Sequence, residues 1–166
     1  MSLVRFRAKA HPQQTRGKGS KEDRRWTPRV LFDPLHSQYR FTVDAAADPD
    51  YSLLPRGWTT VEDGLSQSWR GERVWCNPPY SNIEPWVRKA LEFEAALAVL
   101  LLPANRTEQR WWQELVEPFR DTSFRLTTRF LPGRINFHTP ENPSGKWKSS
   151  APFGCVLLVF QGRVDE

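Results

Sequence analysis

Four consecutive residues, Asn77-Pro78-Pro79-Tyr80, have the clearest chemical potential in this chain. They lie between an apolar run and a helical pattern, which places them in a loop between a strand and a helix. The prolines stiffen that loop and hold two acceptors in place, the Asn77 side-chain carbonyl and the Pro78 backbone carbonyl. Such acceptors can engage the hydrogens of a conjugated amine and expose its lone pair, while Tyr80 stacks on the attached ring. We therefore expect amine activation without a metal or a covalent intermediate.

The elements that must position this loop follow from apolar spacing. Strands are predicted at 41–44, 74–76, 97–102 and 155–160, with shorter ones at 124–126, 129–131 and 135–137. Residues 97–102 form a continuous apolar run, which is typical of a strand buried on both faces of a parallel sheet. Helices are predicted after a Thr27 N-cap with Pro28 at the first position, interrupted near Pro34, and after a capping box at 81–84, where about three turns are expected. A third follows a cap formed by Asn105 with Glu108.

This alternation of strands and helices predicts an α/β sheet with helical cover. In such sheets ligands bind beyond the carboxyl ends of the strands, which is where the Asn77 loop lies. With 166 residues, 39% of them hydrophobic and 13% aromatic, the chain is long enough for a single core. No apolar run reaches the roughly 20 residues that a membrane span needs, so a soluble intracellular protein is expected. Cys76 and Cys155 have no ligand spacing, and no metal site is predicted.

The charge of the chain is concentrated at its N-terminus. The net charge is +5, and residues 1–25 hold eight basic and two acidic side chains, a local +6 that leaves −1 for the rest. We interpret residues 1–25 as a flexible basic arm, which either contacts nucleic-acid phosphates or is a solvated tail. A long loop at 139–150 is the other candidate for a functional segment.

The loop and its surroundings resemble the phage-type DNA N-6-adenine methyltransferase family (Dam-like). The resemblance runs from about residue 26 to the end, which makes 26–166 the methyltransferase domain. The matching segments are Trp26-Thr27-Pro28, Phe41 to Ala47, Glu62 to Ser66 with Trp69, Val74 to Ser81, Trp86-Val87 with Lys89-Ala90, Leu100 to Ala104, and Gly133 to Ile135 with Phe137.

The resemblance implies that S-adenosylmethionine is the methyl donor, that the exocyclic amine of adenine in double-stranded DNA is the acceptor, and that the base flips into the pocket. It also implies a single compact domain with a Rossmann-like methyltransferase sheet, helices on both faces, and a phage-encoded enzyme in the cytoplasm of its bacterial host. The implied catalytic residues are Asn77, Pro78, Pro79 and Tyr80. The implied donor-binding residues are Thr27, Pro28, Asp44, Ala46, Asp63 and Asn77. The expected DNA contacts are Tyr80, Arg106, Arg129, Arg134, Phe137, Lys146 and Lys148.

The sequence departs from the expected pattern after Asp44, where three alanines replace a glycine-rich loop. Several alternatives stay open. The Asn77 loop can be a simple turn, Asp63 before Gly64 an ordinary turn pair, and Phe137 a core residue. The same chemistry suits an RNA base or a protein glutamine amide, and a DNA-binding module that lost catalysis would keep the fold. No membrane partner is expected, and the oligomeric state is open.

Overall fold

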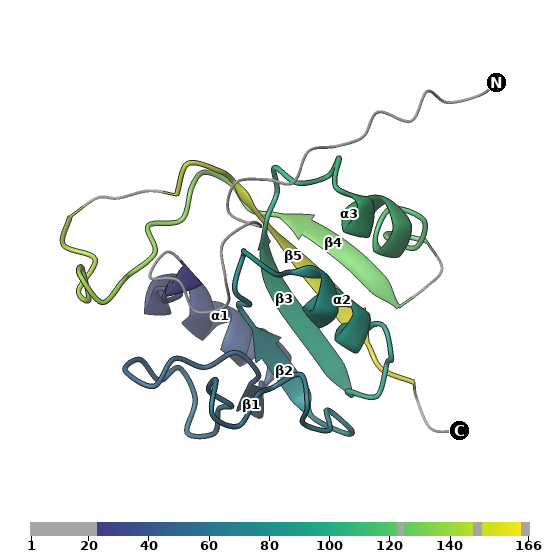
Figure 1. The fold of residues 1–166 in the computed structure, drawn as a ribbon, viewed down its shortest axis with the longest axis horizontal. Helices are drawn as coiled ribbons and strands as arrows, with labels where there is room; N and C mark the ends of the chain where they lie inside the picture. Colours follow the sequence, from purple (N-terminus) through teal and green to yellow (C-terminus); the bar gives the residue numbers. More distant parts are fainter. Residues whose placement is uncertain (1–22, 123–124, 148–150, 164–166) are drawn as a thin grey trace.

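The computed structural model describes residues 23–122, 125–147 and 151–163, and they form a single α/β domain around a five-stranded mixed sheet (Figure 1). The strand order is β1-β2-β3-β5-β4. The strands are β1 Val43–Asp44, β2 Arg73–Cys76, β3 Leu97–Pro103, β4 Leu126–Phe130 and β5 Cys155–Gln161. Parallel pairing joins β1, β2 and β3, whereas β5 runs antiparallel to both of its neighbours. The carboxyl ends of β1, β2 and β3 therefore meet at one edge of the sheet.

The centre of the core is the β3–β5 pair. All seven residues of β3 are buried, and its register with β5 runs from Leu97 opposite Gln161 to Pro103 opposite Cys155. Both segments are continuous apolar runs because helices or loops cover the sheet on both faces at this point. The predictions of strands at 97–102 and 155–160 are confirmed. Strand β3 was expected in a parallel sheet. Its pairing with β2 is parallel, whereas its pairing with β5 is antiparallel.

Three helices accompany the sheet: α1 Arg29–Tyr39, α2 Glu84–Ala90 and α3 Arg110–Leu115. Figure 1 shows α2 and α3 in front of the strands and α1 behind them. Helix α1 packs on the sheet through Phe32, whose ring centroid lies 5.3 Å from that of Trp75 in β2. Within the described residues no helix has the length and apolar character needed to cross a membrane.

The helix boundaries differ from the predicted ones. The N-cap of α1 is Pro28 in an extended conformation, not Thr27, and the helix continues through Pro34 because Phe32 and Leu35 bury its apolar face. Helix α2 has seven residues, about two turns, so the prediction of three turns was wrong. Ser81 does not cap it, because Ile83 is the N-cap and the Ser81 hydroxyl donates to Asp23 instead. Helix α3 begins after Gln109, four residues beyond Asn105.

The region between α3 and β5 holds one described strand where three were predicted. Strand β4 spans the last residue of the first predicted segment and most of the second, while Phe124 lies outside the described residues. Residues 135–137 form no strand. They instead lead into a single bridge between His138 and Trp26, which ties this loop to the start of the described chain. The β-like composition of this segment therefore yields one backbone bridge and no strand.

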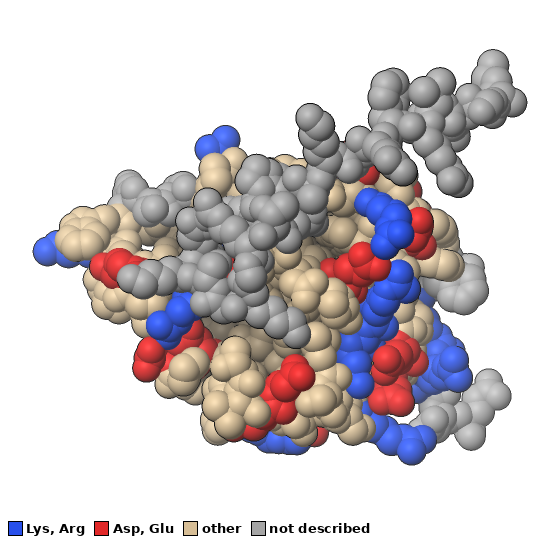
Figure 2. All heavy atoms as spheres, in the orientation of Figure 1, with Lys and Arg blue, Asp and Glu red and all other residues tan. Residues whose placement is uncertain are grey.

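Basic and acidic side chains are interleaved over α2 and α3 (Figure 2). The Glu84 carboxylate lies 2.8 Å from Arg88 and 3.9 Å from Arg110, and Arg120 lies 2.8 Å from Glu117. These exposed pairs contribute little to stability. They leave this face with no uniform charge.

Candidate functional site

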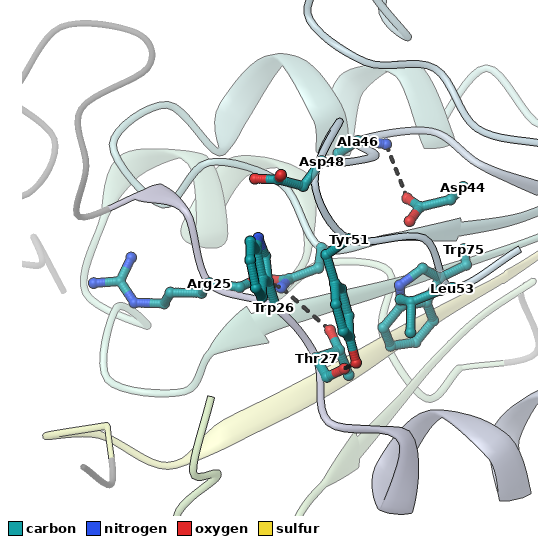
Figure 3. A pocket seen from close by; sticks show the side chains of 10 residues that line it. Arg25, Trp26, Thr27, Asp44, Ala46, Asp48, Tyr51, Leu53 and Trp75 are labelled. Atoms are coloured by element: carbon teal, nitrogen blue, oxygen red, sulfur yellow. Dashed lines mark hydrogen bonds between the residues drawn. The ribbon is translucent and has the colours of Figure 1, made fainter. Parts of the chain in front are cut away.

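A pocket lies where β1 and β2 end side by side (Figure 3). Its empty space is about 250 Å³, a volume that includes open solvent, so the enclosed part is much smaller. Asp44 closes β1, and Asn77 follows β2 directly, so two neighbouring parallel strands deliver both side chains to the same place. This is the expected position of a ligand site in an open α/β sheet. The lining residues are Arg25, Trp26, Thr27, Asp44, Ala46, Asp48, Tyr51, Leu53, Trp75 and Asn77.

Asp44 is a buried acid inside this pocket. Its side chain accepts a hydrogen bond from the Ala46 amide at 3.1 Å, and the residue is only 5% exposed. Burial raises the pKa of the Asp44 carboxyl to about 7, and the nearby Asp48 carboxylate adds to the rise, while the Ala46 hydrogen bond opposes it. Asp44 therefore changes charge near neutral pH. A ligand that brings a positive charge or hydroxyl donors would favour its ionised form.

Two glycines from a later segment pack against the alanine loop that follows Asp44. A Cβ on Gly57 would lie 2.6 Å from the Ala47 Cβ, and one on Gly64 would lie 1.9 Å from the Ala45 carbonyl oxygen. The close backbone approach that a glycine-rich loop would give thus comes from residues 57 and 64. Sequence reasoning missed this role, because the signal is not local to Asp44.

Asn77 is fixed by its amide nitrogen and leaves its oxygen available. Nδ2 donates to the Arg25 carbonyl at 2.8 Å and to the Thr27 Oγ1 at 3.3 Å. Within the described residues, the buried Asn77 Oδ1 has no hydrogen-bond partner. Leaving such an acceptor unsatisfied costs about 1–3 kcal/mol. This arrangement is what a site needs if an amine of a ligand is to donate to Asn77.

The Trp75 indole is a second unpaired group on the same lining. Its Nε1 is buried and has no partner among the described residues. Beside it, the rings of Trp26 and Tyr51 stack in parallel at 4.9 Å, and the Tyr51 hydroxyl donates to the Thr27 carbonyl at 2.8 Å. An unused donor and an unused acceptor therefore share one pocket with a buried acid. That combination points to a polar ligand with at least one aromatic or cationic part.

Tyr80 is buried, with 1% of its surface exposed. Its hydroxyl donates to the Leu101 carbonyl at 3.1 Å, and its burial raises its pKa well above the ordinary value. The Arg25 guanidinium lies over the Tyr80 ring at 5.2 Å and over Phe153 at 5.8 Å. Burial also lowers the pKa of Arg25. In this conformation a guanidinium occupies the ring face on which a planar ligand would stack.

Residues 23–27 form a segment that crosses the site, and we call it the strap. The Asp23 carboxylate accepts hydrogen bonds from the Ser81 amide at 3.1 Å and from its hydroxyl at 2.6 Å. Arg24 forms ion pairs with Asp48 at 2.7 Å and Asp50 at 2.6 Å. Asp23, Arg24 and Arg25, which we assigned to the basic arm, thus contact the domain. The remaining arm residues, 1–22, lie outside the described residues.

Two residues expected to contact DNA support the Tyr80 loop from inside. Arg106 is fully buried and donates to the Tyr80 carbonyl, and burial lowers its pKa to about 10. Phe137 is buried with its ring edge against Tyr80, at a centroid distance of 6.3 Å. Both positions differ from the expected surface contacts. The core alternative for Phe137 is the one that the structure supports.

The other expected residues divide into pocket and surface groups. Thr27, Asp44, Ala46 and Asn77 come together on the pocket lining, whereas Pro28, Pro78 and Pro79 flank it in sequence. Asp63 is exposed on a turn with φ 55° and accepts from the Leu65 amide, outside that lining. Arg129, Arg134 and Lys146 are exposed, and Lys148 lies outside the described residues. Sequence reasoning did not identify Arg25, Tyr51 and Trp75 as parts of the site, because no motif marks them.

The cysteines take no part in this pocket lining. Cys76 and Cys155 are both buried as free thiols, and burial raises the pKa of Cys155 to about 12. Across the described ranges, no group of three or more His, Cys, Asp or Glu side chains is arranged to hold a metal ion.

The sequence of this chain was compared with known proteins. Residues 14–165 match the sequence model of a family described as DNA N-6-adenine-methyltransferase (Dam). A DNA N-6-adenine-methyltransferase of Escherichia phage T1 is 32% identical over 92 residues, which are 53% of this chain and 38% of that protein. A protein of the same name from Haemophilus phage HP1 is 23% identical over 154 residues, which are 86% of this chain and 88% of that protein. The matched part is therefore less than half of the T1 protein and most of the HP1 protein.

Proposed function

The chain belongs to the DNA N-6-adenine-methyltransferase (Dam) family, and on that premise we propose that it transfers a methyl group from S-adenosylmethionine to the exocyclic amine of adenine in DNA. The observation that carries this proposal is the buried Asn77 Oδ1, an acceptor without a partner in the described residues, at the carboxyl edge of the sheet. The predicted Rossmann-like character of the sheet, with helices on both faces, is part of the proposal. The five described strands are consistent with it.

The donor side of the pocket fits S-adenosylmethionine by its chemistry. That molecule carries a sulfonium, an ammonium and ribose hydroxyls, all of which suit a carboxylate, and Asp44 supplies one whose pKa is about 7. The stacked rings of Trp26 and Tyr51 offer aromatic surface for the cation. Trp75 Nε1 adds a hydrogen-bond donor that is otherwise unused. Thr27, Asp44, Ala46 and Trp75 are the residues that would hold the donor.

The acceptor side needs one rearrangement. A target adenine that leaves the DNA stack must reach the Tyr80 ring, and in this structure the Arg25 guanidinium covers that ring. The Tyr80 loop itself is held on two sides, because Arg106 donates to the Tyr80 carbonyl and Leu101 accepts from the Tyr80 hydroxyl. We therefore infer that entry of the flipped base displaces Arg25 and leaves the Tyr80 loop in place.

The chain contributes position and polarity to the reaction. Asn77 Oδ1 and the Pro78 carbonyl accept hydrogen bonds from the adenine amine, which localises the amine lone pair on nitrogen. With the donor bound, the amine nitrogen would accept its methyl group: an N–C bond would form as the S–C bond breaks, and one amine proton would pass to solvent. The acceptors stabilise the positive charge that develops on nitrogen. Bound donor supplies the electrophilic methyl group.

The direct test is transfer of labelled methyl from S-adenosylmethionine to unmethylated duplex DNA, followed by digestion to nucleosides. We expect the label in N-6-methyl-2′-deoxyadenosine. Fully methylated DNA should take up no label. RNA of the same sequence and a glutamine-containing peptide serve as competing acceptors. Label in either of them but not in DNA would overturn the choice of substrate. Failure to bind the donor in a calorimetric titration would identify a module that has lost catalysis.

Replacing Arg25 tests whether its guanidinium competes with the base. In Arg25→Ala, we expect adenosine to inhibit DNA methylation about fivefold more tightly, because adenosine carries no phosphate and only the cation–ring contact has to be broken. The measurement is the inhibition constant of adenosine at fixed donor. Arg29→Ala, which removes a guanidinium 6.0 Å from the Phe32 ring in α1, is the matched control. An unchanged inhibition constant in Arg25→Ala would show that the base does not need this ring face.

Replacing Gly64 tests the close packing behind the alanine loop. In Gly64→Ala the new methyl group must displace the Ala45 carbonyl, which lies 1.9 Å from the Cβ position. We expect a loss of stability of about 1–3 kcal/mol and a donor affinity lowered by tenfold or more. Urea unfolding and calorimetric titration measure the two effects. Gly154→Ala is the control for glycine replacement as such, because the nearest atom to its Cβ position, the Gly133 carbonyl oxygen, lies 3.9 Å away and its φ is not positive. Equal donor affinity in Gly64→Ala and the parent would contradict this role.

A further inference from the structure

Trp147 is the one tryptophan of this chain that is exposed. It is 67% exposed, whereas the other seven are 8% exposed or less and belong to the core: Trp26, Trp58, Trp69, Trp75, Trp86, Trp111 and Trp112. An exposed indole keeps a large apolar surface in water, which is unfavourable unless a partner covers it. The contacts of its loop therefore decide whether Trp147 is a mobile side chain or one that is held in position for a partner.

The loop that carries Trp147 is built around a buried asparagine. The Asn142 Nδ2 donates to the Trp147 carbonyl at 2.8 Å, and the Trp147 amide donates to the Asn142 Oδ1 at 3.4 Å. Asn142 is itself buried and anchored, since its amide donates to the Thr139 carbonyl at 3.0 Å. One side chain thus holds both backbone polar groups of Trp147. The indole is presented on a backbone whose conformation is already fixed.

The base of the same loop is attached to the rim of the donor pocket. The His138 backbone exchanges two hydrogen bonds with Trp26, at 2.8 and 2.9 Å, and its ring lies 6.4 Å from that of Tyr51. Gly145 packs so closely on His138 that a Cβ would lie 2.3 Å from the His138 Nε2. Figure 1 shows the described residues that follow β4, 131–147, projecting outward beyond α1 from the edge where β3 ends. Trp147 is therefore held out from the edge that carries the site.

Exposed cations lie in the same connection between β4 and β5. Lys146 precedes Trp147, and Arg134 lies earlier in the segment, with Glu141 as an exposed acid between them. A planar aromatic next to basic side chains is the combination that binds bases by stacking and the backbone by charge. Membrane lipid would favour several exposed apolar groups together. A protein partner would fit a larger apolar patch, which need not lie near the edge of the sheet that carries the site.

We propose that Trp147 stacks on a DNA base beside the adenine that is methylated, with Asn142 as the residue that positions it. This inference rests on the proposed function, because it takes DNA as the partner. A base that leaves the stack exposes the faces of its neighbours, and an indole has the area to cover one of them. Because Asn142 fixes the backbone in advance, little conformational entropy is lost on contact.

The fluorescence of the chain gives a direct readout, since one tryptophan alone is exposed among eight. Acrylamide quenches the exposed indole, and we expect saturating adenine-containing duplex to protect it, so that the accessible fraction of the emission nearly disappears. In Trp147→Phe the accessible fraction should be small without DNA and should not change on adding it. DNA binding is followed independently by the anisotropy of a labelled duplex. Binding by anisotropy without protection of Trp147 would overturn this inference and leave the proposed function intact, whereas absence of binding would count against the proposed function itself.

Variants separate stacking from charge. We expect Trp147→Ala to weaken DNA binding about tenfold or more with an unchanged salt slope, because stacking releases no counterions, and Lys146→Ala to reduce that slope by about one. Phe119→Ala is the matched control, an exposed aromatic that lies between α3 and β4, away from the carboxyl ends of β1, β2 and β3. Adding Asn142→Ala to Trp147→Ala should cost no further affinity. An equal loss from Phe119→Ala, or a flattened salt slope in Trp147→Ala, would contradict the stacking role.

Discussion

Asn77→Ala is expected to lower the rate of methyl transfer by about 10²–10³-fold, the usual effect of removing one preorganised polar group that stabilises developing charge. In the proposed reaction Asn77 Oδ1 accepts from the adenine amine, and no described side chain donates a hydrogen bond to this atom. The rate is measured in single turnovers at saturating donor and DNA, so that binding does not enter. We expect the fold to persist, because the lost bonds are the two weakly buried ones to Arg25 and Thr27.

Asn77→Asp separates the two halves of this side chain. The carboxylate keeps an acceptor for the amine but cannot donate to the Arg25 carbonyl, so its rate should lie between those of the parent and Asn77→Ala. Asn105→Ala, at an exposed asparagine that follows β3, is the control and should be as active as the parent. If Asn77→Ala transfers methyl at the parental rate, Asn77 does not activate the amine.

Asp44→Asn is expected to raise stability at pH 8 while weakening donor binding. The folded pKa of Asp44 is about 7, above the ordinary value of 3.8. Between these values the folded state keeps a proton that the unfolded state has lost, so the parent loses stability as pH rises from about 4 to 7. The shift corresponds to as much as about 4 kcal/mol at 1.36 kcal/mol per pKa unit. The variant has no such loss, and urea unfolding at pH 5 and pH 8 compares the two.

Donor binding by the parent should strengthen as pH rises, whereas its folding stability falls. If the Asp44 carboxylate holds S-adenosylmethionine, the affinity of the parent falls about tenfold per pH unit below pH 7. In Asp44→Asn the affinity should be low and independent of pH over this range. Calorimetric titrations from pH 5.5 to 8 measure both trends. A parental affinity that does not change with pH would show that the donor makes no use of this charge.

The sequence predicted best those elements whose formation depends on one property of their own residues. The segments that form β3 and β5 are apolar runs that are buried in the centre of the sheet. The predicted bounds of both strands were therefore correct within one residue. Capping signals were less reliable. Ser81 is a residue type that often caps helices, but its hydroxyl donates to the carboxylate of Asp23, which lies 58 residues away in sequence. A contact of that range leaves no trace in the local pattern.

The site shows the same division. Asn77 was identified from the chemistry of its proline-stiffened loop after a strand, whereas Asp44 and Thr27 were expected from the resemblance to the methyltransferase family. Trp75 has the composition of a core residue, and only the orientation of its Nε1 toward the pocket makes it part of the site. Arg106 was misplaced for the opposite reason. Its charge suggested a surface position, whereas its guanidinium is buried and holds the Tyr80 loop.

The strap sets the order in which the site can assemble. Its partners are distant in sequence: Asn77 is separated from Arg25 by 52 residues and Ser81 from Asp23 by 58, and His138 follows later still. Such contacts are slow to form because a long loop must close before they stabilise anything. During synthesis the strap leaves the ribosome before any of these partners exists. One wall of the candidate site is thus among the first described residues made and among the last to reach its place.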